Sequence, residues 1–174
     1  MHMQENESAD QLKTELKEII DQILPPDENA MQKAREHQAK LAKPIGSLGR
    51  LETLSIQLSG ITGKVHNTLE KKALLTFCAD NGVVEEGISI SPQSVTLAQA
   101  VNLANGRTGA GVLASSIGCD IYVYDVGING DVRPLSDKVI DKKIDYGTKN
   151  ITKGAAMTRN QALCAILTGI QAVK

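Results

Sequence analysis

The polar side chains best suited to chemistry lie in one loop between two apolar runs. The loop carries Asp80, Glu85, Glu86, Ser89 and Ser91. The apolar run 73–78 precedes it and a helix-patterned run reaching Ala104 follows it, so the order is strand, loop, helix. In open α/β sheets, ligands bind at the carboxyl ends of strands, in such loops. The alternative interpretation is a solvated connection in which Gly82 and Gly87 serve only as turn residues.

The residues after this loop form a pattern of their own. Ser91 stands directly before Pro92, and proline is favoured at the first helical position, so Ser91 is predicted to be the N-cap of a helix over 92–104. Ser91, Val95 and Gln99 are spaced four residues apart and therefore share one helix face. Ser91 and Gln99 would lie about 12 Å apart along the axis at 1.5 Å per residue. The three side chains therefore form one candidate binding face.

The elements that position this loop follow from hydrophobic periodicity. Helices are expected over residues 8–24, 27–42, 48–61, 92–104, 108–117 and from the capping box at 158–161 onward. Strands are expected over 73–79 and 119–125, with a short third strand or edge over 139–146. A helical crossover between two strands implies parallel pairing and a right-handed connection. The predicted fold is α/β, a Rossmann-like partial parallel sheet with helices on both faces. The N-terminal helical segment is assigned to 1–63 and the α/β domain to 64–174.

Composition excludes several classes of function. Hydrophobic residues make up 41% and charged residues 22% of the 174-residue chain, with a net charge of -1, as in ordinary globular proteins. Aromatics are only 2%, and there is no basic excess, which argues against binding to nucleic acid. No apolar run has membrane-spanning length, and the N-terminus lacks the features of a signal peptide. No histidine or cysteine spacing indicates a metal site, and we assign no metal and no cofactor.

The three cysteines are far apart in sequence and each lies in an apolar run. They are Cys78, Cys119 and Cys164. Buried reduced thiols are favoured over a disulfide or a metal site. A cytoplasmic location is the expectation that follows.

Several blocks of this sequence occur in the order and spacing of one enzyme family. The loop 79–96 and the upstream run 43–52 resemble nicotinate-nucleotide–dimethylbenzimidazole phosphoribosyltransferase, which activates the lower-ligand base of cobalamin. Further matching blocks are 105–109 with 112–114, 125–128, and 150–154 with 157–159. This sequence departs from the family at Asn81, where histidine is usual, at Ile45, where proline is usual, and at Ala155, where proline usually follows Gly154. The family's chain also continues well beyond the position of Lys174.

The resemblance implies transfer of phosphoribose from nicotinate mononucleotide to a ring nitrogen of dimethylbenzimidazole, which gives an α-linked ribotide and nicotinate. The family's acceptor-contacting serine and glutamine correspond to Ser91 and Gln99. We add Val95 and the loop residues Asp80, Asn81 and Gly82 to the predicted substrate-binding set. The family forms homodimers, so a homodimer is expected here.

The resemblance also implies what this stretch lacks. The family's Gly-rich phosphate loop and its general-base glutamate lie past the position of Lys174, so no catalytic residue is assigned and the chain alone is expected to be inactive. Glu85 and Glu86 are not taken as substitute bases, because nothing in the match gives them that role. Asp80 and Asp125, at strand ends, are expected to hold loops by accepting backbone N–H bonds.

The leading hypothesis is that the chain is the N-terminal portion of this enzyme, and two other hypotheses remain. The chain is alternatively a non-catalytic base-binding subunit that needs a second chain. A generic Rossmann-like nucleotide-binding domain is disfavoured, because the glycines of 106–111 have the wrong spacing for a dinucleotide motif and follow a helix. Lys43 and Arg50 either face an anionic substrate or, in the favoured interpretation, neutralise local helix termini or lie in water.

Overall fold

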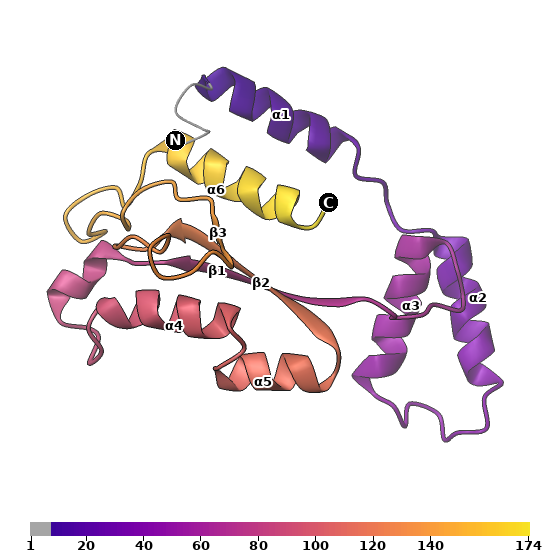
Figure 1. The fold of residues 1–174 in the computed structure, drawn as a ribbon. Coiled ribbons are helices and arrows are strands. Elements are labelled where there is room, and N and C mark those ends of the chain that lie inside the picture. The colour runs from indigo at the N-terminus through magenta and orange to yellow at the C-terminus, as the bar shows by residue number, and fades with distance from the viewer. Residues whose placement is uncertain (1–7) are drawn as a thin grey trace. The chain divides into compact units, whose positions relative to one another are not determined.

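The computed structural model describes residues 8–174, which form two compact units. The α/β unit contains residues up to 21 together with 71–174, and the helical unit contains residues 22–70. Each unit has its own packing, and Figure 1 labels the helices and strands of both. The chain therefore leaves the α/β unit after its first helix and returns to it at the first strand.

The α/β unit is built on a parallel sheet of three strands in the order β1-β2-β3. The strands are β1 (Lys72–Ala79), β2 (Cys119–Gly127) and β3 (Val139–Asp141). Lys72 pairs with Cys119 and the register holds to Cys78 and Asp125, after which it shifts so that Ala79 pairs with Gly127. The predicted parallel pairing is confirmed, although β3 ends five residues before its predicted limit.

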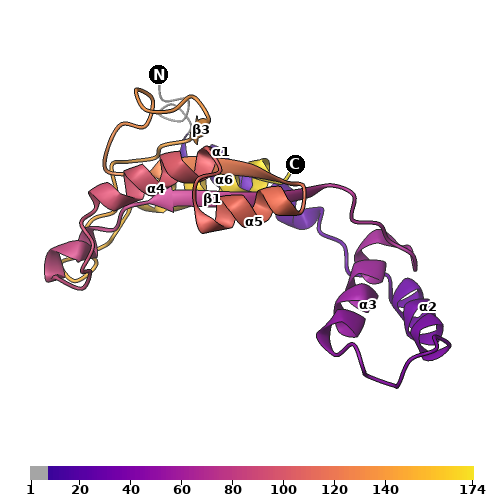
Figure 2. The same cartoon turned by 60° about the horizontal axis from the view of Figure 1, so that its bottom comes forward.

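Helices cover both faces of this sheet, as the fold class requires. Helices α4 (Ser94–Ala104) and α5 (Gly109–Ser116) lie on one face, and α6 (Arg159–Ala172) lies on the other with α1 (Ala9–Asp21) outside it (Figures 1 and 2). The core between the sheet and α4 is aliphatic and centres on Ala100, Leu103, Val123, Ile128, Val132 and Val139. The chain has no Trp and one Phe, so aliphatic side chains supply this core.

Helix α1 belongs to the α/β unit and not to a separate N-terminal segment. Its Leu12 is only 2% exposed and packs with Leu163, Cys164 and Leu167 of α6. The structure therefore replaces the predicted boundary at residue 63 by a division at residues 21 and 71. Periodicity shows that a helix buries one face, but it does not show which element covers that face.

The helical unit contains α2 (Glu28–Ala39) and α3 (Arg50–Thr62). The predicted cap is confirmed, because the Asp27 carboxylate accepts the N–H of Ala30. Within this unit, Lys43 Nζ lies 2.7 Å from Glu52 Oε1, and this contact holds the pKa of Glu52 below its usual range. Lys43 therefore pairs with the side chain of Glu52, and not with a helix terminus or with water alone as the sequence suggested.

Candidate functional site

The loop after β1 folds into a short 3-10 helix, η1 (Gly82–Glu86), which the sequence did not predict. Gly87 ends it in the left-handed conformation with φ 68°, a backbone angle that favours glycine. A cavity of about 340 Å³ opens between η1 and the start of α4. Its wall includes Asp80, Asn81, Val83, Ile88, Ser89, Ser91, Gln93, Val95 and Thr96. This volume is at the small end of ligand cavities, which run from about 300 to 1,000 Å³.

Asp80 is buried in the cavity wall, with an exposed fraction of 4%, and both of its carboxylate oxygens are engaged. Oδ1 accepts the Thr96 hydroxyl at 2.7 Å, and Oδ2 accepts the N–H of Asn129 at 2.8 Å. The predicted role of Asp80 as an acceptor of backbone N–H bonds is confirmed. Because both oxygens are used, this carboxylate links β1, α4 and the segment after β2.

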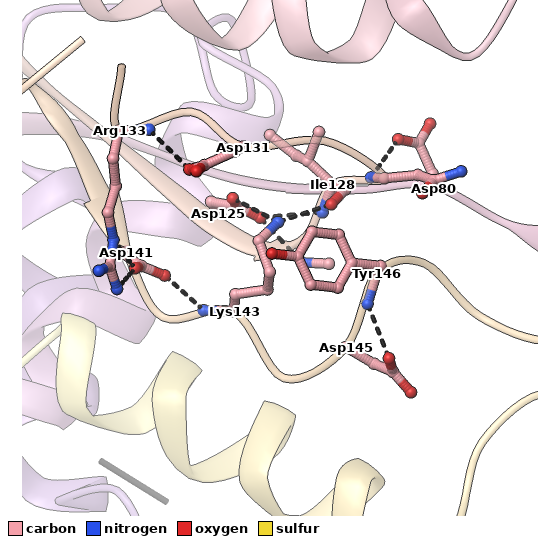
Figure 3. Close-up of polar contacts among 11 residues, drawn as sticks. Asp80, Asp125, Ile128, Asp131, Arg133, Asp141, Lys143, Asp145 and Tyr146 are labelled. Carbon is pink, nitrogen blue, oxygen red and sulfur yellow. Dashed lines mark hydrogen bonds and ion pairs between the residues drawn. The ribbon is translucent and has the colours of Figure 1, made fainter. Parts of the chain in front are cut away.

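Asp125 has the same role at the end of β2 and is completely buried. Its Oδ1 accepts the N–H groups of Gly127 at 3.1 Å and Ile128 at 2.9 Å, which confirms the prediction. Its Oδ2 forms an ion pair with Lys143 Nζ at 2.7 Å, although it makes no aligned hydrogen bond. Figure 3 shows Lys143 reaching across to Asp125 and to the carbonyl of Ile128.

Glu85 and Glu86 tie η1 to the segment 150–153. Lys153 Nζ donates to Glu85 Oε2 at 2.6 Å, and Asn150 Nδ2 donates to Glu86 Oε1 at 2.6 Å. The hydrogen bond from Lys153, with a further one from Asn150, lowers the pKa of Glu85. These contacts give both glutamates a structural role.

Cys78 precedes the loop on β1 and is half-buried. Burial raises the pKa of its thiol, and the carboxylates of Asp125 and Asp80 raise it further. A thiol with a raised pKa is mostly protonated and is a poor nucleophile. Cys78 is therefore not a candidate for the chemistry of this site.

Ser91 is not the N-cap of α4, contrary to the prediction. The helix begins at Ser94, and Gln93 occupies the cap position without a side-chain cap bond. The hydroxyl of Ser89 accepts the N–H of Ser91 and donates to its carbonyl, so the chain turns here before the helix starts. Ser91 lies in the cavity wall with an exposed side chain.

The structure brings four of the six predicted site residues into this wall. They are Asp80, Asn81, Ser91 and Val95. Gln99 lies one turn beyond Val95 on α4, is exposed, and does not line the cavity. Gly82 also lies outside the lining, because its backbone packs against residues 148–150.

The described residues offer no cluster of three His, Cys, Asp or Glu side chains placed to hold a metal ion. Between residues 8 and 174, no helix has the length and apolar character needed to cross a membrane.

Comparisons with known proteins show the family of this chain. A family model described as Phosphoribosyltransferase matches residues 23–174. The chain belongs to this phosphoribosyltransferase family. The resemblance found in the sequence blocks is confirmed.

Individual relatives carry a more specific name. The nicotinate-nucleotide–dimethylbenzimidazole phosphoribosyltransferases of Clostridium tetani and Ruminiclostridium cellulolyticum are 46% and 47% identical over 158 and 156 residues. These matches cover 91% and 90% of this chain but 43% and 44% of the relatives, so the chain spans less than half of their length. The crystal structure of the enzyme from Thermus thermophilus has a TM-score of 0.76 at 35% identity, and the match covers 84% of this chain and 44% of that one.

Sequence reasoning missed three residues that support this candidate site. Asn129 Nδ2 donates to Gln93 Oε1 at 3.2 Å, and Gln93 Nε2 reaches the carbonyl of Asn81 at 3.4 Å. Lys143 pairs with Asp125 from 18 residues further along the chain. No spacing pattern reveals these contacts, because each joins residues that only the tertiary fold brings together.

Proposed function

We propose that this chain carries the acceptor-base pocket of a nicotinate-nucleotide–dimethylbenzimidazole phosphoribosyltransferase. The enzyme transfers phosphoribose from nicotinate mononucleotide to 5,6-dimethylbenzimidazole and releases α-ribazole phosphate and nicotinate, a step in assembling the lower ligand of cobalamin. The observation that carries the proposal is the cavity after β1, where apolar side chains and a few polar groups meet at a strand end.

In this proposal the base lies against Val95, with the Ser91 hydroxyl directed at a ring nitrogen. Both residues line the cavity, and the apolar side chains of Val83 and Ile88 supply further contact with a flat ring. Gln99 lies on the same face of α4 as Val95 and contacts the far edge of the base. Asp80 fixes the wall through its bonds to Thr96 and Asn129 and does not touch the base.

We further propose that the chain does not catalyse the transfer by itself. Asp80 is the only carboxylate in the cavity wall of the described residues, and its oxygens are already engaged. A base is needed to take the proton from the azole nitrogen, and loss of general-base catalysis costs about 10² to 10⁴ in rate. Incubating the chain with nicotinate mononucleotide and dimethylbenzimidazole should therefore give no measurable ribotide.

Binding of dimethylbenzimidazole tests the pocket directly. Ser91→Ala should weaken binding in a titration about fivefold, the worth of one hydrogen bond, and Gln99→Ala should also weaken it. Ser94→Ala and Gln171→Ala are matched controls, because both residues are exposed, neither lines the cavity, and neither shares the face of α4 that carries Val95 and Gln99. If the Ser91 and Gln99 variants both bind the base as well as the parent does, this assignment of the pocket is wrong.

The alternative function is a non-catalytic base-binding subunit that needs a second chain. The observation that favours it is the cavity wall, where the carboxylate of Asp80 is already engaged by Thr96 and Asn129, as suits binding without catalysis. Reading the encoding DNA past Lys174 separates the two hypotheses. An in-frame extension with a Gly-rich loop and a late glutamate supports a single enzyme, whereas a stop codon followed by a distinct gene supports a subunit.

We also propose a homodimer in the cytoplasm. The outer edges of β1 and β3 have no partner strand in the described part of the chain, and such edges favour association. Cys78 and Cys119 are free thiols, which are typical of reducing compartments. Light scattering across a wide concentration range tests the dimer, and a monodisperse monomer throughout would count against it.

A further inference from the structure

Lys143 is buried on the segment after β3, and it does not line the cavity at the end of β1. Its side chain is 5% exposed, and its Nζ lies 2.7 Å from Asp125 Oδ2. The same nitrogen donates to the carbonyl of Ile128 at 2.6 Å and lies 4.7 Å from the centre of the Tyr146 ring. A buried ammonium is stable only where it is paired and hydrogen-bonded, so this geometry is specific.

These two contacts clasp the Asx turn over residues 125–128 at the carboxyl end of β2, in which Asp125 Oδ1 accepts the Gly127 N–H. Asp125 is at the start of the turn and Ile128 at its end, and Asp125 Oδ1 also accepts the Ile128 N–H at 2.9 Å. Lys143 thereby bridges a side chain and a carbonyl three residues apart, as Figure 3 shows. The turn cannot open without leaving the Lys143 ammonium or the Asp125 carboxylate buried with a lost partner.

The residue after this turn reaches the cavity wall. The N–H of Asn129 donates to Asp80 Oδ2 at 2.8 Å, and its side chain donates to Gln93 Oε1 at 3.2 Å. Asp80 and Gln93 both line the cavity. The position of Asn129 therefore depends on the clasped turn, and the cavity wall depends on Asn129.

We infer that Lys143 is a positioning residue for the acceptor pocket, acting through Asp125, Ile128 and Asn129. This inference rests on the proposed function, because it concerns the same cavity. The surrounding charges fit a role specific to Lys143. The neighbouring carboxylate of Asp141 is paired with Arg133. From Lys143 it accepts the backbone N–H and not the ammonium, so the Lys143 ammonium contacts the turn instead.

Three variants of the full 174-residue chain test the inference. Lys143→Met keeps the length of the side chain but removes its charge and donor, and Lys143→Arg keeps both. Lys142→Met is the matched control, because Lys142 contributes its backbone N–H, and not its side chain, to the bond with the Asp125 carbonyl. The readouts are titration with dimethylbenzimidazole and hydrogen exchange of the Asn129 amide.

Lys143→Met should weaken base binding about tenfold, the cost of one displaced charged hydrogen bond, and should speed Asn129 exchange by a similar factor. Lys143→Arg should retain most of both properties, and Lys142→Met should match the parent. Parent-like affinity and parent-like exchange in Lys143→Met would overturn the inference.

A double variant separates positioning from simple stabilisation. Lys143→Met with Asp125→Asn removes both buried charges, so the unfolding midpoint should recover while the bond to the Ile128 carbonyl stays lost. Base affinity should then remain weak and Asn129 exchange should remain fast. If affinity and exchange recover together with stability, Lys143 only neutralises Asp125 and the inference is refuted.

The same experiment distinguishes failure of the inference from failure of the proposed function. A parent chain that binds no dimethylbenzimidazole would refute the proposed pocket. The exchange measurement decides the role of Lys143 in that case as well, because unchanged Asn129 exchange would refute it and faster exchange would support it. If Lys143→Met does not fold, base affinity and Asn129 exchange are compared between the double variant and the parent instead.

Discussion

Replacing Gly82 by alanine should distort the loop that forms the proposed pocket. A Cβ atom at this position would lie 2.5 Å from the Thr148 carbonyl oxygen, 2.6 Å from the carbonyl carbon of Lys149 and 2.7 Å from the Asn150 nitrogen. All three are backbone atoms. The segment is fixed by the bond from the Thr148 N–H to the Asp80 carbonyl at 2.9 Å, so it cannot move aside without losing that bond.

The expected cost follows from these distances. Overpacking of this kind destabilises proteins by about 1–3 kcal/mol, and separating η1 from 148–150 also breaks the bond from the Gly82 N–H to the Thr148 hydroxyl. Alanine also lowers the conformational entropy of the unfolded chain, which offsets about 0.4–1 kcal/mol of this loss in stability. The net loss for Gly82→Ala should therefore be about 1–3 kcal/mol, or a decrease in Tm of about 2–12 °C for a chain of this size.

Thermal unfolding followed by circular dichroism measures this loss, with Gly109→Ala as the matched control. A Cβ at Gly109 meets no atom within 4 Å and Gly109 begins helix α5, so this variant should be as stable as the parent or slightly more stable. If the free energy of unfolding of Gly82→Ala lies within about 0.5 kcal/mol of the parent value, the reasoning is refuted, because residues 148–150 would then move aside without a measurable cost.

Three further measurements test other parts of the structure. Thr158→Ala should cost about 1 kcal/mol of unfolding free energy, because it removes the capping box of α6, and an unchanged midpoint would contradict the cap. Ser91→Ala should change stability by less than about 0.5 kcal/mol, since Ser91 is not a cap, and a larger loss would contradict the observed helix start. Lys153→Met should raise the pKa of Glu85 toward its usual value of 4.5 in an NMR titration. Because the pKa of Glu85 is lowered in the folded protein, the contact stabilises the protein at pH values above the unfolded pKa. This stabilisation should be lost as the pH falls through the folded pKa. An unchanged Glu85 pKa in Lys153→Met would exclude the bond.

Local signals in the sequence identified most of the elements. The apolar run at 73–79 predicted β1, and the pattern Thr158–Gln161 predicted the capping box that begins α6. The helical crossover predicted parallel pairing of β1 and β2. These features depend on residues close together in the chain, so a short stretch of sequence is sufficient to specify them.

The predicted start of the helix after the loop was wrong, because a competing local interaction prevailed. The order Ser91–Pro92 favours a helix start, but the Ser89 hydroxyl binds the Ser91 backbone and delays the helix to Ser94. Serine hydroxyls offer the backbone an alternative to helical bonds, and the sequence alone does not show which alternative is the more stable.

The family and the strand-end carboxylates were also determined by the sequence. The blocks between Lys43 and Arg159 carried the resemblance, and the family match over residues 23–174 confirmed it. Asp80 and Asp125 were expected to accept backbone N–H bonds, because they end consecutive parallel strands, and both do so.

Only the tertiary structure decided which distant residues meet. Helix α1 buries Leu12 against α6, about 150 residues further along the chain, and Lys143 pairs with Asp125 at the end of β2. Burial and charge pairing depend on which surfaces approach each other, and many partners of similar chemistry satisfy the same local pattern. The sequence therefore determined the elements and the family of this protein, whereas packing decided the boundary of its α/β unit and the support of its candidate site.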